Sequence, residues 1–437
     1  MLSSAMNAGT AHEDARNGDY APDARAPEEM GVYVHFPWCL AKCPYCDFLS
    51  IAVDSPEAGR PPTAAEARSS LPHRAYADAV LNELELRLTR LARPLPRLAS
   101  IFFGGGTPSL WDPSELGRVL EAILSAFAAR ASDVEITVEC NPSSLDARHV
   151  EGLLRAGVNR VSIGVQALEL ERLRFLGRLH DAGGALAAIS TALASGMPRV
   201  SADLIYGVYK QDPETAVDEV NRVADLGVTH LSAYALTIEP NTRFGSLART
   251  GHLPLLDDDL VARSFERVSA ALQARGFRHY EISNFARAGA ESIHNQGYWL
   301  GRDYLGLGTG AFGTVRLASA PQGERVRYKN LLSAERYQRA WNERTRDFEP
   351  FVDELSEREE LDAETSLKEV LLLGLRLEDG IDVAASERAM GAPLFTRARR
   401  KAANRLIQAG KLEEIDGRLR IPRKHWLFAD GIIRDLL

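Results

Sequence analysis

From Gly31 onward, short apolar segments alternate with longer segments whose apolar positions recur every three or four residues. The short segments predict strands, and the longer ones predict helices with one buried face. The expected strands are Val32–Phe36, Ser100–Phe103, Glu135–Glu139, Arg160–Val165, Arg199–Ile205 and His230–Leu236. The expected helices between them are Tyr76–Leu91, Pro113–Ala129, Leu145–Ala156, Gly183–Ser195 and Pro213–Leu226. Such repeated strand–helix units are typical of a parallel sheet covered by helices, here an α/β fold.

The same pattern divides the chain into regions. Six strand–helix units predict an open or partial (β/α)6 barrel over residues 31–245. Residues 54–72 interrupt it with four prolines, which predicts a surface insertion loop. Residues 1–30 carry acidic side chains and no apolar core of a signal peptide, so we expect a disordered N-terminal tail. After residue 245 the alternation ends, and residues 246–437 are expected to form a C-terminal, mostly helical domain.

The C-terminal region has its own pattern. Helices are expected at Asp258–Arg275, Ala334–Glu343, Leu361–Leu377 and Leu394–Ala409. The chain then resembles a winged-helix hairpin, in which Leu412–Ile415 and Arg418–Ile421 flank an Asp-Gly turn. The helix before this hairpin is basic. A solvated helix face explains its charge, and contact with nucleic acid is the alternative.

Charge and cysteine usage narrow the range of functions. The 437 residues carry a formal net charge of −8, which would repel a polyanion and argues against nucleic acid as a partner. No apolar run approaches the roughly 18 to 20 residues that span a bilayer. Only four cysteines occur, and three of them lie within eight positions, which is unlike a disulfide framework. We therefore expect a cytoplasmic protein.

Three cysteines share one short loop directly after the first expected strand, with the spacing Cys39-x-x-x-Cys43-x-x-Cys46. Three thiolates at this spacing can ligate three corners of a four-iron, four-sulfur (4Fe–4S) cluster. The fourth iron is then free to chelate S-adenosylmethionine (SAM), and a low-potential cluster can donate an electron to its sulfonium. A zinc site is an alternative, but it would need a fourth ligand at finger-like spacing, and His35 lies on the strand. Three core cysteines are the other alternative.

A glycine-rich string, Gly104-Gly105-Gly106-Thr107-Pro108, follows the second expected strand, where parallel α/β folds build their sites. Polar residues recur at the ends of later strands, although each alone could serve as a structural hydrogen-bonding group. Together with the cysteine loop, these positions resemble the radical SAM superfamily and, within it, the oxygen-independent coproporphyrinogen III oxidase family. The resemblance implies SAM contacts at Tyr33, Phe48, Gly105, Gly106, Thr107, Glu139, Gln166, Arg178 and Asp203.

Over nearly all of residues 31–437, the chain is most similar to the HemW-type haem chaperones, a branch related to this oxidase. The oxidase carries a further cysteine two residues after the last cluster ligand, whereas this chain has Phe48 there. The string His294-Asn295-Gln296-Gly297-Tyr298-Trp299 resembles the His-Asn-x-x-Tyr-Trp signature of the chaperone branch, and Asp303–Gly308 continues the same pattern. The sequence departs from its relatives at residues 207–211, which predicts a differently shaped turn after the fifth strand, so no contacts are assigned to residues 208–210.

The resemblance implies a haem chaperone that binds a 4Fe–4S cluster, SAM and haem and transfers haem to an acceptor protein. Membrane association would then be peripheral, through the acceptor. His294 would offer an imidazole to haem iron, Asn295 a polar contact, and Tyr298 and Trp299 aromatic faces. The alternative for the His-Asn pair is a turn whose side chains satisfy backbone groups.

Two other functions compete with this interpretation. The first is the oxidase reaction of porphyrin biosynthesis, the oxidative decarboxylation of two propionates of coproporphyrinogen III, against which the absent cysteine counts. The second is RNA modification by a radical SAM enzyme, against which the acidic charge counts. Whether SAM is used catalytically stays open.

Overall fold

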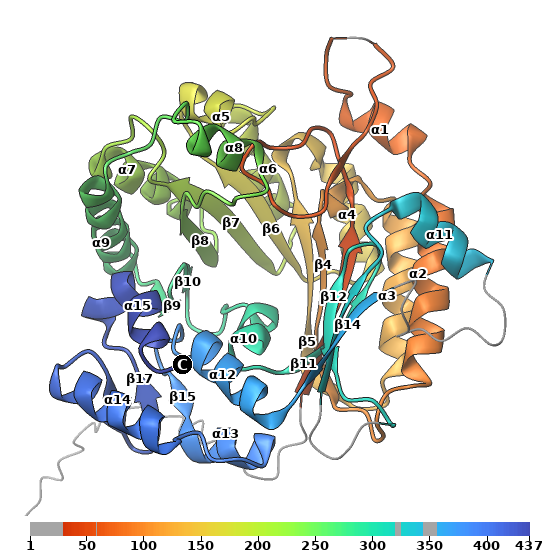
Figure 1. Ribbon diagram of the computed structural model, residues 1–437. Coiled ribbons are helices and arrows are strands. Elements are labelled where there is room, and N and C mark those ends of the chain that lie inside the picture. The colour runs from red at the N-terminus through yellow and green to blue at the C-terminus, as the bar shows by residue number, and fades with distance from the viewer. Residues whose placement is uncertain (1–28, 58, 320–324, 344–355) are drawn as a thin grey trace, which may run out of the picture.

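The computed structural model describes residues 29–57, 59–319, 325–343 and 356–437, in which a large curved sheet is wrapped by helices (Figure 1). Six parallel strands follow one another across the middle of this sheet. They are β1 Glu29–Phe36, β4 Arg97–Gly105, β5 Arg130–Cys140, β6 Arg160–Gln166, β7 Arg199–Tyr206 and β8 His230–Ala235. All six expected strands are thus confirmed. Residues 29 and 30 of the expected tail belong to β1, and the rest of that tail lies outside the described residues.

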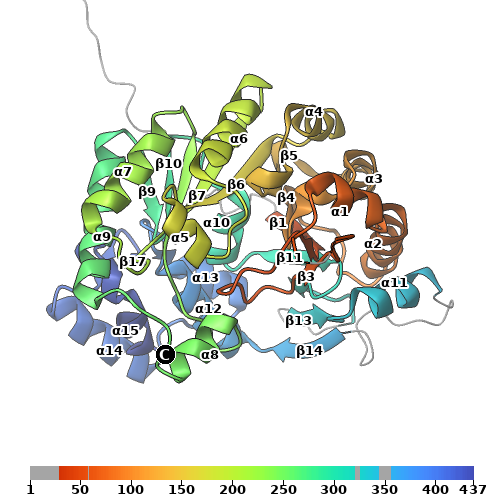
Figure 2. The ribbon, with the colours of Figure 1, turned by 90° about the horizontal axis from the view of Figure 1, so that it is seen from above.

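Helices between these strands form the outer layer (Figure 2). They are α2 His73–Leu88, α3 Pro113–Ala126, α4 Ala147–Ala156, α6 Ala182–Ala194 and α7 Pro213–Ala224. The short helix α5 Leu170–Phe175 lies instead at the top of the molecule in Figure 1. Local chemistry fixes the helix ends, as in α4, where the Asp146 side chain accepts a hydrogen bond from the backbone N–H of His149. Gly157 ends the same helix at a φ of 102°, a conformation that favours glycine. The five expected helices are confirmed.

The sheet continues past these six strands on both sides. Beyond β8 lie β10 Asn284–Ala286 and β9 Arg278–Glu281, and beyond β1 lie β11 Asp303–Leu307, β12 Phe312–Val315, β13 Arg325–Asn330 and β14 Ser356–Leu361. The region expected as a mostly helical domain, residues 246–437, thus also contributes six short strands to the main sheet. These strands are only three to six residues long, which is too short for a clear alternation of apolar and polar positions.

The sheet stays open, because its edge strands β14 and β9 stand at opposite ends of the strand order. The helix α10 (Ile293–Trp299) packs against β4 and β1 on the inner side of the curve. Three further helices in this part of the chain are α8 Arg243–Arg249, α9 Asp258–Ala274 and α11 Ala334–Asn342. Among the helices that the structure describes, none has the length and apolar character needed to cross a membrane.

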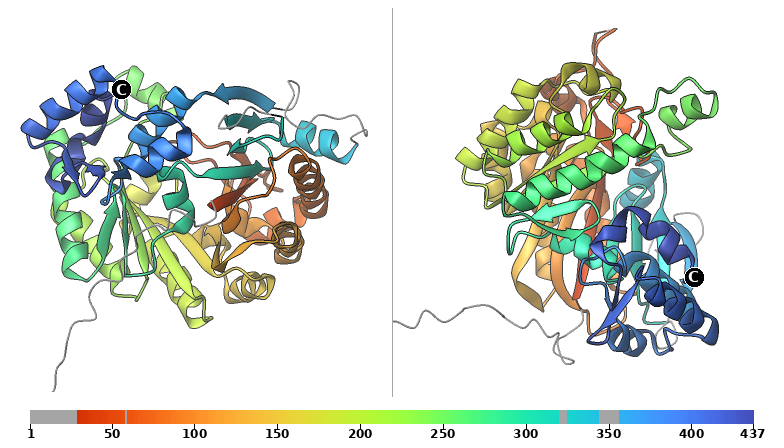
Figure 3. Two further views of the ribbon diagram at one scale, coloured as in Figure 1. Left: turned by 90° about the horizontal axis from the view of Figure 1, so that it is seen from below. Right: turned by 90° about the vertical axis from the view of Figure 1, so that its left-hand side faces the viewer.

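The last part of the chain has a separate hydrophobic core and lies against the open side of the sheet (Figure 3). Its elements are α12 Ala363–Gly374, β15 Ile381–Asp382, α13 Val383–Met390, α14 Arg397–Gln408, β16 Glu413–Ile415, β17 Arg418–Arg420 and α15 Ala429–Arg434. The expected hairpin is confirmed, since β16 and β17 are antiparallel and Asp416 and Gly417 between them both have positive φ. On the basic helix α14, Arg399 pairs with Glu364 and Arg400 with Glu414, which accounts for part of its charge within the fold.

Residues 54–72, which the sequence predicts to be a surface loop, also contain a helix. This helix is α1, Ala64–Ser70, whose start is fixed by a capping box between Thr63 and Glu66. The Arg68 guanidinium donates to the carbonyl oxygens of Ser109 and Ser144, so α1 is tied to the main body. The prolines that suggested a loop lie before the helix and directly after it.

A buried carboxylate joins α2 to the strands beyond β1. Glu83 has no exposed surface, and one of its oxygens accepts hydrogen bonds from Arg87 Nε at 2.6 Å and from Asn330 Nδ2 at 2.7 Å. The other oxygen accepts from the backbone N–H of Gly308 at 2.8 Å and from the Tyr337 hydroxyl at 2.5 Å. A fully hydrogen-bonded buried charge of this kind fixes the relative position of the elements that it joins.

We expect the substitution Glu83→Ala to lower the free energy of unfolding by about 3–5 kcal/mol, because it removes the carboxylate from a buried Arg87 guanidinium. Urea unfolding followed by circular dichroism measures the loss. Glu121→Ala, at an exposed position of α3, is the control and should change stability by less than about 0.5 kcal/mol. Equal losses for the two variants would contradict this role of Glu83.

Candidate cofactor site in the central cavity

The concave side of the sheet encloses a cavity of about 1100 Å³. Its outer end lies at the loop that follows β1, between the short strands β2 Trp38–Cys39 and β3 Ile51–Ala52. Its inner end lies at the beginnings of β6 and β8 and at α10. The structure brings all three loop cysteines and all nine expected SAM contacts to this one cavity. The nine are Tyr33, Phe48, Gly105, Gly106, Thr107, Glu139, Gln166, Arg178 and Asp203.

The three loop cysteines are free thiols in a partly buried loop. The Thr107 hydroxyl lies 3.4 Å from Cys39 Sγ, and the Arg178 guanidinium lies 3.5 Å from Cys43 Sγ. Burial raises the pKa of Cys39 to about 12 and also raises that of Cys46. Burial thus disfavours the thiolate form of these side chains, and a bound metal centre would supply the positive charge that favours it.

A single metal ion fits the loop less well. Over the described ranges, no three His, Cys, Asp or Glu side chains are placed to hold one ion together. The ligands of a cubane bind different irons and need not meet at one point. His35, the histidine considered for zinc, is engaged elsewhere, with Nε2 2.8 Å from the Leu49 carbonyl oxygen and Nδ1 3.0 Å from the Tyr33 hydroxyl.

The glycine-rich string bends sharply where β4 ends. Gly105 has a φ of 112°, and a Cβ there would lie 2.4 Å from the His35 ring. A Cβ on Gly106 would lie 2.6 Å from the backbone of Pro37. The glycines therefore let this string pack directly against the end of β1, next to the cysteine loop. The backbone N–H of Gly105 donates to Glu139 at 3.0 Å.

Two carboxylates face the cavity from neighbouring parts of the sheet. Burial and the nearby charge of Asp203 raise the pKa of Glu139 to about 8. Burial also raises the pKa of Asp203, although the Ser162 hydroxyl lies 3.0 Å from both of its oxygens. A cationic group placed between the two would relieve their mutual repulsion. The amino group of SAM is such a cation.

Gln166 and Arg178 connect the end of β6 to the cysteine loop. Gln166 has a φ of 67°, which is strained for a residue other than glycine and lies beside an irregularity in the β6–β7 pairing. The Arg178 guanidinium donates to the carbonyl oxygen of Gly164 at 2.8 Å as well as approaching Cys43. Phe48 is 61% exposed at the cavity mouth.

The turn at residues 207–211, where the sequence departs from its relatives, is held by the side chain of Gln211. The Gln211 side-chain oxygen accepts a hydrogen bond from the backbone N–H of Gly207 at 2.8 Å, and its amide nitrogen donates to Glu219. Residues 208–210 are not among those that line the cavity. Their position thus agrees with assigning no contacts to these three residues.

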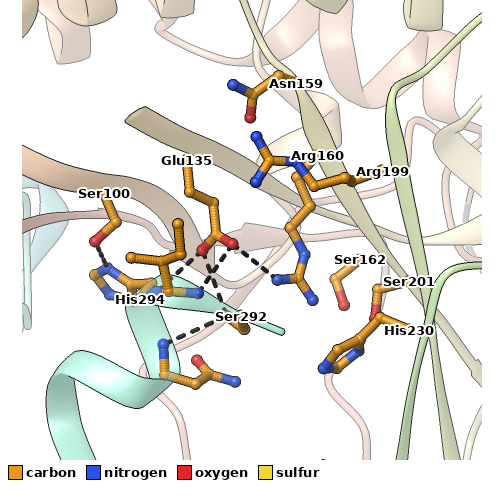
Figure 4. Close-up of polar contacts among 12 residues, drawn as sticks. Ser100, Glu135, Asn159, Arg160, Ser162, Arg199, Ser201, His230, Ser292 and His294 are labelled. Carbon is orange, nitrogen blue, oxygen red and sulfur yellow. Dashed lines mark hydrogen bonds and ion pairs between the residues drawn. The ribbon is translucent and has the colours of Figure 1, made fainter. Parts of the chain in front are cut away.

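The helix α10 is held at the inner end of the cavity by Glu135 (Figure 4). This buried carboxylate accepts hydrogen bonds from the backbone N–H groups of Ile293 and His294, both at 3.0 Å, and from the Ser292 hydroxyl at 3.4 Å. Arg160 donates to it at 3.0 Å. Burial alone would raise the pKa of Glu135, but the Arg160 guanidinium and the helix N–H groups lower it below its usual range. An ionised carboxylate at a helix N-terminus stabilises the helix.

The His294 ring is buried and hydrogen bonded at both nitrogens. Nδ1 lies 2.9 Å from the Ser100 hydroxyl, Nε2 lies 3.0 Å from the Tyr298 hydroxyl, and the ring stacks on Phe102. Burial lowers the pKa of His294 to about 4, so the imidazole is neutral at physiological pH. A neutral imidazole is the form that ligates metals.

Of the other three expected haem contacts, two line the cavity and one does not. Asn295 and Tyr298 line the cavity beside His294. Trp299 does not line it, and the Arg376 guanidinium lies 5.9 Å from the centre of its ring instead. The expectation that Trp299 presents a face to haem is thus not supported by its position. The sequence analysis included Glu135 and Arg160 only as parts of expected strands. Their charges within apolar strands were a signal that each needs a buried partner.

Comparisons with known proteins show which family the chain belongs to. A family model described as Radical SAM superfamily matches residues 33–223, and one described as HemN C-terminal domain matches residues 361–428. Heme chaperone HemW of Mycobacterium tuberculosis is 34% identical over 94% of this chain and 95% of its own length. HemW of Escherichia coli is 39% identical over 65% of this chain and 70% of its own length.

One solved structure shows the same overall fold. Coproporphyrinogen III oxidase (HemN) from Escherichia coli, described as a radical SAM enzyme, aligns with a TM-score of 0.70 and 20% identity. The alignment covers 94% of this chain and 90% of that protein.

The raised pKa of Glu139 predicts a pH-dependent stability difference between the cluster-free parent and the variant Glu139→Gln. Above the ordinary pKa of 4.5 the unfolded parent loses this proton, whereas the folded parent keeps it until about pH 8. The parent therefore loses stability relative to the variant as the pH rises from about 4.5 to about 8, and the difference then levels off. Urea unfolding of both proteins at pH 5, 7 and 9 measures it. A difference that does not change with pH would contradict the assignment.

Proposed function

The chain belongs to the HemW family of the radical SAM superfamily, and on this premise we propose that it is a haem chaperone. It binds a 4Fe–4S cluster and SAM, carries haem and passes it to an acceptor protein. The observation that carries the proposal is the 34% identity over 94% of the chain with a HemW heme chaperone. The convergence of the expected cluster and SAM residues on one cavity supports it.

In this proposal Cys39, Cys43 and Cys46 ligate the cluster. When bound, a low-potential cluster supplies an electron to the sulfonium of SAM. The chain's own contribution is to orient the loop, through the contacts of Thr107 and Arg178 with two of the sulfurs. Hydrogen bonds to cluster sulfurs are among the features that set its reduction potential.

SAM would lie between the cysteine loop and the ends of β4 to β7. Glu139 and Asp203 would hold its amino group, because each is a carboxylate with few hydrogen bonds facing the cavity. The glycines of the string give backbone groups close access to the ligand. Tyr33, Phe48, Gln166 and Arg178 would complete the contacts, as all four line the same space.

Haem would be bound at the inner part of the cavity, beside α10. His294 is neutral, and its Nε2 atom would bind haem iron in place of the Tyr298 hydroxyl. Asn295 and Tyr298 would contact the macrocycle, since both line the cavity. A cavity of about 1100 Å³ exceeds the roughly 300–1,000 Å³ of small-ligand sites, which leaves room for a second ligand beside SAM.

We also propose that the chain acts in the cytoplasm, where a reducing environment preserves its four free cysteines. The acceptor would be a protein that receives haem, and any membrane association would be through that acceptor.

A paired assay on anaerobically reconstituted protein tests the function against the oxidase alternative. One half titrates haem and follows its Soret absorbance. The other incubates the protein with coproporphyrinogen III, SAM and a reductant and looks for vinyl products. Haem binding without vinyl products is the expected result. Formation of vinyl products would establish the oxidase reaction and overturn the proposal.

Substitution at α10 tests the haem ligand. We expect His294→Ala to shift the Soret band and to weaken haem binding at least tenfold, because the iron loses its proposed ligand. Tyr298→Phe should bind haem at least as tightly as the parent, since the competing hydroxyl at Nε2 is gone. His252→Ala, at an exposed position, is the control. An unchanged spectrum and affinity for His294→Ala would exclude this ligand.

A further inference from the structure

Two polar side chains on neighbouring strands line the cavity and have unused hydrogen-bond donors. Thr137 on β5 and Arg160 on β6 are paired in register, so they stand side by side on the sheet. Both line the cavity, and their side chains are almost fully withdrawn from solvent, at 0% and 3% exposure. The Thr137 hydroxyl is buried and has no hydrogen-bond partner. An unsatisfied buried hydroxyl is costly, so its position calls for an acceptor.

The Arg160 guanidinium is only partly used within the fold. One of its N–H groups donates to Glu135, and no second hydrogen bond from it occurs among the residues that the structure describes. Its charge also lowers the pKa of Asp203, against the larger rise that burial causes. Glu135 already accepts from Ser292, Ile293 and His294, so it is saturated by donors from α10. A guanidinium has five N–H groups in a planar fork that matches a carboxylate. Arg160 therefore still has donors to offer toward the cavity.

The charges around Arg160 leave room for an anion. His230 is neutral, because burial lowers its pKa well below the usual value. Both of its ring nitrogens are hydrogen bonded, to Ser201 and to Tyr280. Glu139 would face the amino group of SAM in the proposed function, and that cation would offset its charge. Asp203 is the remaining carboxylate on this side, and it is hydrogen bonded by Ser162.

We propose that Arg160 and Thr137 form a subsite for an acid group of the bound ligand. The inference rests on the proposed function, in which the ligand is haem and the acid group is one of its two propionates. Glu135 places the subsite next to the proposed iron ligand, because it holds both Arg160 and the backbone of His294 (Figure 4). The macrocycle would thus be fixed at its iron by α10 and at one edge by β5 and β6.

The test compares haem with haem dimethyl ester, in which both propionates are esterified and uncharged. Thr137→Val keeps the shape of the side chain and removes only the hydroxyl, so it preserves the pairing of Arg160 with Glu135. Arg160→Gln removes the charge as well, and Arg160→Lys keeps it without the planar fork. Ser366→Ala, which removes another buried hydroxyl without a partner but on α12, is the matched control.

Thr137→Val should weaken haem binding about tenfold, the loss expected for one hydrogen bond to a charged group, and leave binding of the ester unchanged. Arg160→Gln should weaken haem binding more than tenfold and change ester binding little. Arg160→Lys should weaken haem binding by an intermediate amount. Equal effects of Thr137→Val on haem and ester, or none on either, would overturn the subsite. Absence of haem binding by the parent would instead overturn the proposed function itself.

Discussion

The parallel order of β1 and β4 to β8 is the constraint on which the rest of the site depends. Parallel strands joined by outer helices place all their carboxyl ends at one edge of the sheet. The cysteine loop after β1, the glycine string after β4 and Glu139 near the end of β5 meet there for this reason. Because the sheet is curved, its concave side encloses the cavity beside these strand ends. Side chains from widely separated parts of the chain can thereby face a common ligand.

Buried carboxylates attach later parts of the chain to this sheet. Glu135 on β5 accepts the N-terminal hydrogen bonds of α10, about 160 residues away in sequence, and so closes the inner end of the cavity. Glu83 on α2 accepts hydrogen bonds from Gly308 and Asn330 and so attaches the strands beyond β1. Burying a charge is expensive unless it is fully hydrogen bonded, and both carboxylates meet that condition with several donors. Their position within the fold is therefore tightly specified.

The regular part of the fold was predictable from sequence because its strands and helices are long enough to show their periods. The strands β9 to β14 were not predicted because they are short, and because β11 and β12 contain glycines, Gly306 and Gly313, that interrupt the apolar pattern. The expected cluster residues come from their spacing and the expected SAM positions from a family resemblance, and the structure brings both sets to one cavity. The partners of His294 could not, since Ser100 and Glu135 approach it only through the packing of α10 on the sheet. Trp299 shows the converse, because a residue of the right type in the right motif points away from the cavity.

In the proposed function, three loop thiols hold a 4Fe–4S cluster whose free iron binds SAM. Electron paramagnetic resonance of the anaerobically reconstituted, reduced protein, with and without SAM, tests this arrangement, with iron and zinc measured on the same sample. We expect about four irons per chain, a spectrum that changes when SAM is added, and loss of both when Cys39, Cys43 and Cys46 are replaced by alanine. Zinc in place of iron, or iron retained in full by the triple variant, would contradict it.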